Sequence, residues 1–180
     1  MWKLLEAWVN QCLLMINFKK AVFFDRDGVI NKERKDHVKT IEELEIFPNI
    51  IESIKKLKNS GFAIIVVTNQ SAINRGLITH KKVDEIHSTI QGYLKQYGTK
   101  IDNFYYCPHK PEENCQCRKP KPGLLFKAAD ELHLNLESSW LIGDNDTDTQ
   151  AAISAGCRAI QINSNNDLQD AVQEIINSSD

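Results

Sequence analysis

The sequence lacks long apolar runs, internal repeats and any large excess of charge. No uninterrupted apolar stretch reaches the roughly 18–20 residues that a membrane-spanning helix requires. The 22 Lys and Arg against 24 Asp and Glu give a net charge of −2, so nothing indicates broad electrostatic attraction to nucleic acid or anionic membranes. We therefore expect neither as a partner. The composition favours a small globular domain, which we expect to be a monomer.

Cysteine is scarce, and its distribution is uneven. Three of the five cysteines lie within eleven residues of one another and beside His109, namely Cys107, Cys115 and Cys117. An odd number of thiols clustered beside a histidine is typical of a metal site and not of a disulfide framework. Because free thiols persist in a reducing compartment, we expect a cytoplasmic protein.

The apolar residues follow two different spacings. Short apolar runs bounded by turn residues predict buried strands at 21–24, 62–67, 101–106, 140–142 and 159–162. Helical spacing separates these runs, at 50–57, 79–97, 124–132, 151–156 and 168–176. Strands that alternate with helices predict an α/β fold, and 180 residues suit one domain with a sizeable core.

The first residues are interpreted as an extension of that domain. Residues 2–16 carry apolar side chains close to helical spacing, so we expect a helical extension at 1–18 and a single domain at 19–180. A signal peptide is the alternative, but polar residues interrupt the apolar stretch and no small-residue cleavage site follows. A true start at Met15 is a further alternative.

The strand predicted at 21–24 ends in two carboxylates. Asp25 and Asp27 flank Arg26, and Gly28 follows them. Ligands of open α/β sheets bind at the carboxyl ends of the strands, so these acids stand where chemistry usually occurs. Two acids one residue apart can point in different directions, so one can act as nucleophile or metal ligand while the other handles a proton. An Asp-x-Asp pair is also common in simple turns, so its meaning depends on the other strand ends.

Two further strand ends and one loop carry polar groups that suit the same reaction. These are Thr68, Asn69, Gln70 and Ser71 after the second strand, Arg118 and Lys119 before a helix, and Asp144, Asn145 and Asp148 after the fourth strand. Each segment alone could be a turn or a solvated hinge. Together they place several carboxylates at one point, where they repel one another unless a cation shares them.

A hard divalent ion with oxygen ligands, such as Mg²⁺, removes that repulsion. Hydroxyl, amide and ammonium donors on the other strand ends suit phosphoryl oxygens. The combination predicts Mg²⁺-dependent phosphoryl transfer through an acyl-phosphate. In this mechanism Asp25 attacks phosphorus, and Asp27 protonates the leaving oxygen and then deprotonates the hydrolytic water.

The cysteine cluster predicts a second metal of a different kind. Three thiols and one imidazole close a tetrahedral zinc shell without an open position, and closed shells are structural. The ligands would be Cys107, His109, Cys115 and Cys117. We expect Zn²⁺ to brace a loop at 107–119 that presents Arg118 and Lys119 to phosphate. A catalytic Cys–His pair is the alternative, but a nucleophile needs no further thiols nearby.

These segments together resemble the four motifs of the haloacid dehalogenase superfamily. The motifs are Asp25-Arg26-Asp27-Gly28, Thr68-Asn69, Lys119, and Gly143-Asp144 with Asp148. The resemblance runs from about residue 21 to residue 162. It implies a Rossmann-like three-layer sandwich with a central parallel sheet of order 5-4-1-2-3, and an aspartyl-phosphate mechanism without a cap domain.

The resemblance also implies a role for each site residue. Catalytic roles fall to Asp25, Asp27, Thr68 and Lys119. The Mg²⁺ ligands would be Asp25, the carbonyl of Asp27, and Asp144, supported by Asn145 and Asp148. Substrate contacts would come from Arg26, Asn69, Gln70, Ser71 and Arg118.

The sequence Cys-Pro-His followed by Cys-x-Cys-Arg-Lys-Pro is more specific, because it resembles the zinc-loop phosphatases of that superfamily. These include phosphatases of heptose bisphosphates and of histidinol phosphate, and residues 68–76 and 118–123 are more similar to the heptose enzymes. We therefore expect removal of the C7 phosphate from a heptose 1,7-bisphosphate, a sugar phosphate of lipopolysaccharide biosynthesis. A histidinol-phosphatase and a non-enzymatic zinc module that binds a phosphorylated ligand are the alternatives. The chain departs from the family at residues 36–38, where Asp-His-Val replaces Gly-Tyr-Val, and at Asn145, where a basic residue is frequent.

Overall fold

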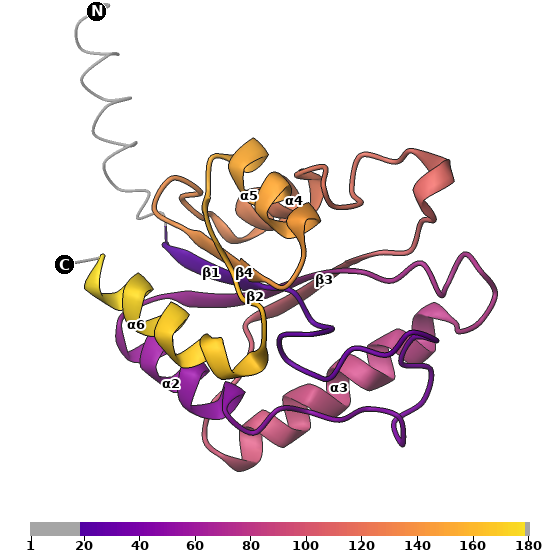
Figure 1. Cartoon of the computed structure of the whole chain (residues 1–180), viewed down its shortest axis with the longest axis horizontal. Coiled ribbons are helices and arrows are strands. Elements are labelled where there is room, and N and C mark those ends of the chain that lie inside the picture. The colour runs from indigo at the N-terminus through magenta and orange to yellow at the C-terminus, as the bar shows by residue number, and fades with distance from the viewer. Residues whose placement is uncertain (1–18, 179–180) are drawn as a thin grey trace, which may run out of the picture.

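The computed structural model describes residues 19–178, so the helix expected at 2–16 lies outside the described residues (Figure 1). Its strands are β1 (Ala21–Phe24), β2 (Ala63–Asn69), β3 (Asn103–Cys107), β4 (Trp140–Gly143) and β5 (Arg158–Gln161). Its α-helices are α2 (Ile50–Asn59), α3 (His80–Gln96), α4 (Gly123–Leu132), α5 (Asp146–Ala155) and α6 (Leu168–Asn177). Two short 3₁₀ helices complete the set, η1 (Pro111–Glu113) and η2 (Asn165–Asp167).

The strands form one parallel sheet in the order β3-β2-β1-β4-β5, which confirms the predicted order. In the central strand, Phe23 pairs with Ile65 of β2 and with Leu141 of β4. Parallel strands bring their carboxyl ends to the same edge of the sheet, so the polar segments that follow β1, β2 and β4 meet there.

Two strand boundaries differ from the sequence prediction by two residues, and the others agree within one residue. β2 continues past Val67, because Thr68 and Asn69 still pair with the end of β3. β3 begins two residues later than predicted. The backbone of Ile101 bonds with the side-chain amide of Gln91 in α3, at 2.7 and 3.0 Å, instead of extending the strand.

Helices cover both faces of the sheet (Figure 1). α2, α3 and α6 pack on one face, where Ile54 and Ile90 join a core cluster that includes Phe24. α4 and α5 cover the other face, where Leu125 packs in the cluster that includes Phe23. Neighbouring residues of β1 thus point into opposite cores, as expected of a strand buried on both sides. This is the predicted three-layer sandwich. Between residues 19 and 178, the helices are too short or too polar to cross a membrane.

The connection from β1 to α2 folds back on itself near the carboxyl end of β1. Asn31 forms isolated β-bridges to Asp27 and to Ile46, and Phe47 donates a backbone hydrogen bond to Ile30 at 3.0 Å. These contacts close the loop, so that the charged residues within 32–45 are held close to the end of β1.

Candidate active site

A cleft of about 420 Å³ lies at the carboxyl ends of β1, β2 and β4. Nine of the predicted site residues line it: Asp25, Asp27, Thr68, Asn69, Ser71, Arg118, Lys119, Asp144 and Asn145. Of the residues predicted for phosphoryl transfer, three lie outside its lining, namely Arg26, Gln70 and Asp148. The fold thus brings together segments that span more than a hundred residues of sequence.

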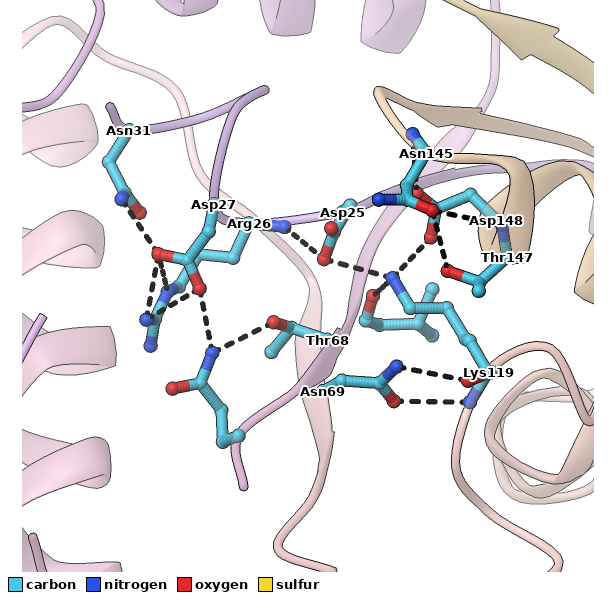
Figure 2. Close-up of polar contacts among 12 residues, drawn as sticks. Asp25, Arg26, Asp27, Asn31, Thr68, Asn69, Lys119, Asn145, Thr147 and Asp148 are labelled. Carbon is cyan, nitrogen blue, oxygen red and sulfur yellow. Dashed lines mark hydrogen bonds and ion pairs between the residues drawn. The ribbon is translucent and has the colours of Figure 1, made fainter. Parts of the chain in front are cut away.

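Lys119 is a buried cation beside the cleft (Figure 2). Its Nζ lies 2.9 Å from Asp25 Oδ1 and 2.5 Å from Asp148 Oδ1, and it donates a hydrogen bond to the Val67 carbonyl at 2.9 Å. Burial acts to lower the pKa of Lys119, but the two carboxylates outweigh it and raise that pKa. The side chain therefore stays charged.

Asn69 fixes the segment that carries Lys119. Its side-chain amide donates to the Lys119 carbonyl and accepts from the Lys119 backbone N–H, both at 3.1 Å. The sequence predicted a substrate contact for Asn69. Although Asn69 lines the cleft, its amide is already used in this pair of hydrogen bonds.

Three carboxylates converge beside Lys119. Asp25, Asp144 and Asp148 place carboxylate oxygens within 4.8 Å of one another. Burial raises the pKa of Asp25 to about 7, although Lys119 opposes the shift. Burial, together with the charge of Asp148, raises the pKa of Asp144 to about 6. One lysine thus leaves the cluster short of positive charge, and a divalent cation with oxygen ligands fits this donor set.

Glycine makes the close approach of these carboxylates possible. Gly28 has a φ of +86°, and a Cβ there would collide with the carboxylate of Asp144. A Cβ on Gly143 would collide in the same way with the side chain of Asp148. Both positions therefore require glycine if the two acids are to keep their places.

Asp148 and Asn145 order the start of α5. The Asn145 backbone N–H donates to Asp148 Oδ2 at 3.2 Å, and the Thr147 backbone N–H donates to Asn145 Oδ1 at 3.3 Å. This reciprocal arrangement is a capping box. It holds the Asp148 carboxylate, which is buried, against Lys119.

Asp27 has very different surroundings from Asp25, although only Arg26 separates them (Figure 2). Arg26 Nη2 donates to both carboxylate oxygens of Asp27, at 2.9 and 2.8 Å. Asn31 Nδ2 and Gln70 Nε2 add hydrogen bonds of 2.9 and 2.8 Å. Burial acts to raise the pKa of Asp27, but Arg26 and these donors hold it below its ordinary value.

The structure corrects the predicted placement of Arg26 at the substrate. Its side chain is fully buried, and its guanidinium faces Asp27 and His87 instead of the cleft. Gln70 is also buried behind the cleft, where its Nε2 donates to Asp27 and, at 2.9 Å, to Thr68 Oγ1. Both residues hold other site residues in place. The sequence gives the position of a residue after a strand end, but it does not give the direction in which its side chain points.

The lining of the cleft also contains residues to which the sequence gave no role. Glu33, Arg34 and His37 come from the connection after β1, and Thr147 comes from α5. The run of charged residues after β1 was the available signal for the first three, but a solvated loop has the same signal. His37 has a positive φ of 64°, at a place where the resembled family carries a Gly-Tyr-Val segment.

The four predicted zinc ligands form one compact cluster. Five pairs among their donor atoms are 3.2 to 3.5 Å apart, and they come from Cys107, His109, Cys115 and Cys117. A tetrahedron with ligands about 2.0–2.3 Å from zinc has edges of roughly 3.3–3.8 Å, so the donor set fits that ion. Arg118, next in the chain, donates to the His109 carbonyl at 3.2 Å and lines the cleft.

The sheet order, the carboxylates after β1 and β4, and the buried lysine before α4 define a phosphatase of the haloacid dehalogenase (HAD) superfamily. In agreement, a HAD-hydrolase-like family profile matches residues 116–179. A Helicobacter pylori (strain J99) protein named D-glycero-beta-D-manno-heptose-1,7-bisphosphate 7-phosphatase is 44% identical over 142 residues, which cover 78% of this chain and 81% of that protein. The protein of the same name from Escherichia coli (strain K12) is 39% identical, with 75% of this chain and 74% of that protein covered.

A solved structure of a heptose bisphosphate phosphatase is also similar to this chain. The D,D-heptose 1,7-bisphosphate phosphatase from B. bronchiseptica, complexed with magnesium and phosphate, matches with a TM-score of 0.77 and 32% identity. The match covers 86% of each chain. The present chain belongs to the family of the D-glycero-beta-D-manno-heptose-1,7-bisphosphate 7-phosphatases.

Proposed function

We propose that the protein removes the C7 phosphate of D-glycero-D-manno-heptose 1,7-bisphosphate through a phosphorylated Asp25. The observation that carries this proposal is the meeting of Asp25 with Lys119 and Asp144 at one cleft. The names of the relatives supply the sugar. Arg34 and Arg118 in the lining of the cleft suit the second phosphate of a bisphosphate. We place the reaction in the cytoplasm, on the route to heptose-containing glycans such as lipopolysaccharide.

In the first step, a carboxylate oxygen of Asp25 attacks phosphorus, and the bond from phosphorus to the sugar oxygen breaks. Thr68 donates its hydroxyl proton to a phosphoryl oxygen, since its oxygen already accepts a hydrogen bond from Gln70. Lys119 offsets negative charge on the group in transfer. Asp27 gives a proton to the leaving sugar oxygen. The negative charge of a phosphoryl group bound beside Asp27 favours the protonated form that this step needs.

In the second step, Asp27 takes a proton from water while the water oxygen attacks phosphorus. The bond between phosphorus and Asp25 breaks, inorganic phosphate forms, and the Asp25 carboxylate is restored. The ionised Asp27, with its lowered pKa, is the form that accepts this proton.

Two metal ions belong to the proposal. Mg²⁺ would be held by Asp25, the backbone carbonyl of Asp27, and Asp144, with Asp148 and Asn145 in support, and would offset charge on the phosphoryl group. Zn²⁺ would be held by the four cysteine and histidine ligands of the 107–119 loop. Its role there is structural, because its shell is closed and Arg118 and Lys119 follow the last ligand.

A phosphate-release assay with Mg²⁺ tests the substrate. The panel contains the heptose 1,7-bisphosphate, histidinol phosphate and fructose 1,6-bisphosphate, and ³¹P NMR identifies which phosphate is lost. We expect the highest kcat/KM on the heptose bisphosphate, with loss of the C7 phosphate. A higher kcat/KM on histidinol phosphate would assign the protein to the other zinc-loop activity. Binding without phosphate release from any compound would indicate a non-enzymatic module.

A further inference from the structure

His87 is a buried titratable residue that the proposed mechanism does not use. It lies in α3 and is 5% exposed. Its ring stacks on Phe104, with centroids 4.6 Å apart and an interplanar angle of 17°. The ring of Tyr106 packs against it in an edge-type arrangement, with centroids 5.7 Å apart and an interplanar angle of 63°. Two aromatic residues of β3 thus fix the plane of the imidazole.

The imidazole contacts Arg26 at Nη1, the guanidinium nitrogen that does not contact Asp27. His87 Nε2 is 3.5 Å from Arg26 Nη1. A guanidinium has only donors, so Nε2 is the acceptor and the ring proton is on Nδ1. Burial, together with the charge of Arg26, lowers the pKa of His87 to about 3, which keeps the ring neutral.

Arg26 therefore lies between two acceptors. Its Nε and Nη2 donate to Asp27, and its Nη1 faces His87. The guanidinium is fully buried, so loss of either acceptor leaves an unsatisfied donor without access to water. His87 thus fixes the rotation of a planar group whose other edge holds both oxygens of Asp27.

We propose that His87 is a positioning residue for the phosphatase reaction, which orients the Asp27 carboxylate through Arg26. His87 does not line the cleft and acts only through this contact. The inference rests on the proposed acid–base role of Asp27. It predicts that the step most sensitive to His87 is proton donation to the leaving oxygen.

The leaving group separates this role from a purely structural one. A sugar alkoxide leaves with difficulty and needs a proton, whereas p-nitrophenolate departs readily without one. The value of kcat/KM reports the first irreversible step, here phosphoryl transfer to Asp25. A fault in proton donation therefore lowers kcat/KM for a sugar phosphate but not for p-nitrophenyl phosphate. Loosened packing lowers kcat/KM for both substrates.

Three variants of His87 test the contact. His87→Phe keeps a ring to stack on Phe104 but removes the acceptor. His87→Asn keeps a polar group that is too short to reach Arg26. His87→Gln keeps an oxygen at about the reach of Nε2. The matched control is His80→Phe, because exposed His80 lies on the same helix and contacts Tyr106 but has no contact with Arg26.

We expect kcat/KM of His87→Phe and His87→Asn to fall about tenfold on the sugar phosphate, a part of the 10²–10⁴ that a general acid contributes. We expect a change of less than about twofold on p-nitrophenyl phosphate, recovery of most of the loss in His87→Gln, and an unchanged substrate ratio in His80→Phe. Equal losses on both esters, or no loss in either variant, would overturn the inference. If one variant does not fold, the other decides.

Asp27→Asn is the reference for the proposed function. It is expected to lose much more activity on the sugar phosphate than on p-nitrophenyl phosphate. If Asp27→Asn loses the same activity on both esters, the proposed acid role of Asp27 is overturned, and the role of His87 is overturned with it. If Asp27→Asn is selective for the leaving group and the two His87 variants are not, only the role of His87 is overturned.

Discussion

Within residues 19–178, two groups of side chains have the donor atoms to hold a metal ion, and they are built in opposite ways. Asp25 and Asp144 follow two strand ends and line an open cleft, and the carboxylate of Asp148 joins them from the first turn of α5. The four cysteine and histidine ligands come from eleven consecutive residues and face one another. The first group is short of positive charge and leaves room for a ligand. The second already has the four donors of a closed shell. The open group therefore suits chemistry, and the closed group suits the bracing of a loop.

The largest expected effect is on the open group. Asp25→Asn removes the nucleophile, so we expect kcat to fall at least about 1,000-fold. Burial raises the pKa of Asp25, so removal of its charge should leave the melting temperature unchanged or higher. Phosphate release and thermal unfolding measure the two quantities. Asp170→Asn, at an exposed position of α6, is the control and should keep full activity. Wild-type turnover in Asp25→Asn would contradict the proposed mechanism.

A smaller loss is expected from the closed group. Cys115→Ser should release zinc and lower activity about 10- to 100-fold, the size of effect seen when a support of a functional group is removed. The cause is a looser loop that no longer fixes Arg118 and Lys119. Cys157→Ala removes a buried thiol outside the cluster and should retain one zinc per chain. Elemental analysis and phosphate release compare the two variants. Full zinc content in Cys115→Ser would contradict the assignment.

Glycine substitutions test how closely the open group must pack. Gly28→Ala and Gly156→Ala both place alanine at positive φ, 86° and 80°, and each should cost about 1–2 kcal/mol of stability. Only Gly28→Ala also pushes on the carboxylate of Asp144, since Gly156 has open space around it. We therefore expect Mg²⁺ to bind more weakly in Gly28→Ala alone, so that the Mg²⁺ concentration for half-maximal activity rises about tenfold. Equal Mg²⁺ titrations for the two variants would show that the close approach is unimportant.

The smallest expected effect is the dependence of Mg²⁺ stabilisation on pH. Burial raises the pKa of Asp25 to about 7 and, with Asp148, that of Asp144 to about 6. Without metal, the folded state between about pH 4 and 7 holds protons that the unfolded state has released, so stability falls as pH rises through this window. Mg²⁺ binds the ionised carboxylates and offsets that loss.

The rise in melting temperature on addition of Mg²⁺ should therefore be larger at pH 8 than at pH 5.5. Each kcal/mol of stabilisation corresponds to about 2–4 °C for a chain of this size. Differential scanning calorimetry with Mg²⁺ and with EDTA measures the rise. In Asp25→Asn, this rise in melting temperature should depend less on pH. An equal rise at both pH values would contradict the raised pKa values.

The architecture could be predicted from the sequence because its signals are local. Short apolar runs and helical spacing located each strand and α-helix between residues 19 and 178, but neither of the two 3₁₀ helices, and the resemblance supplied the sheet order. The start of β3 could not be predicted. It depends on a contact between Ile101 and Gln91 that competes with strand pairing.

The site was predictable to the extent that it is built from strand ends. Asp25 and Asp144 meet because the parallel strands that they follow end at one edge, and Lys119 reaches them from the connection between β3 and α4. The surroundings of Asp27 were not predictable. The direction of the Arg26 side chain depends on what lies behind the cleft, including His87, which is 61 residues away in sequence. No local pattern marks a contact of that kind.

The central claim is that Asp25 becomes phosphorylated during turnover. A direct test mixes the enzyme with Mg²⁺ and a sugar bisphosphate, quenches within milliseconds, and reduces with borohydride, which converts an aspartyl-phosphate to homoserine. Mass spectrometry of the peptide that contains residues 21–32 then locates the change. The mechanism predicts homoserine at position 25 and unmodified Asp27. Modification at a different residue, or none under conditions that release phosphate, would contradict it.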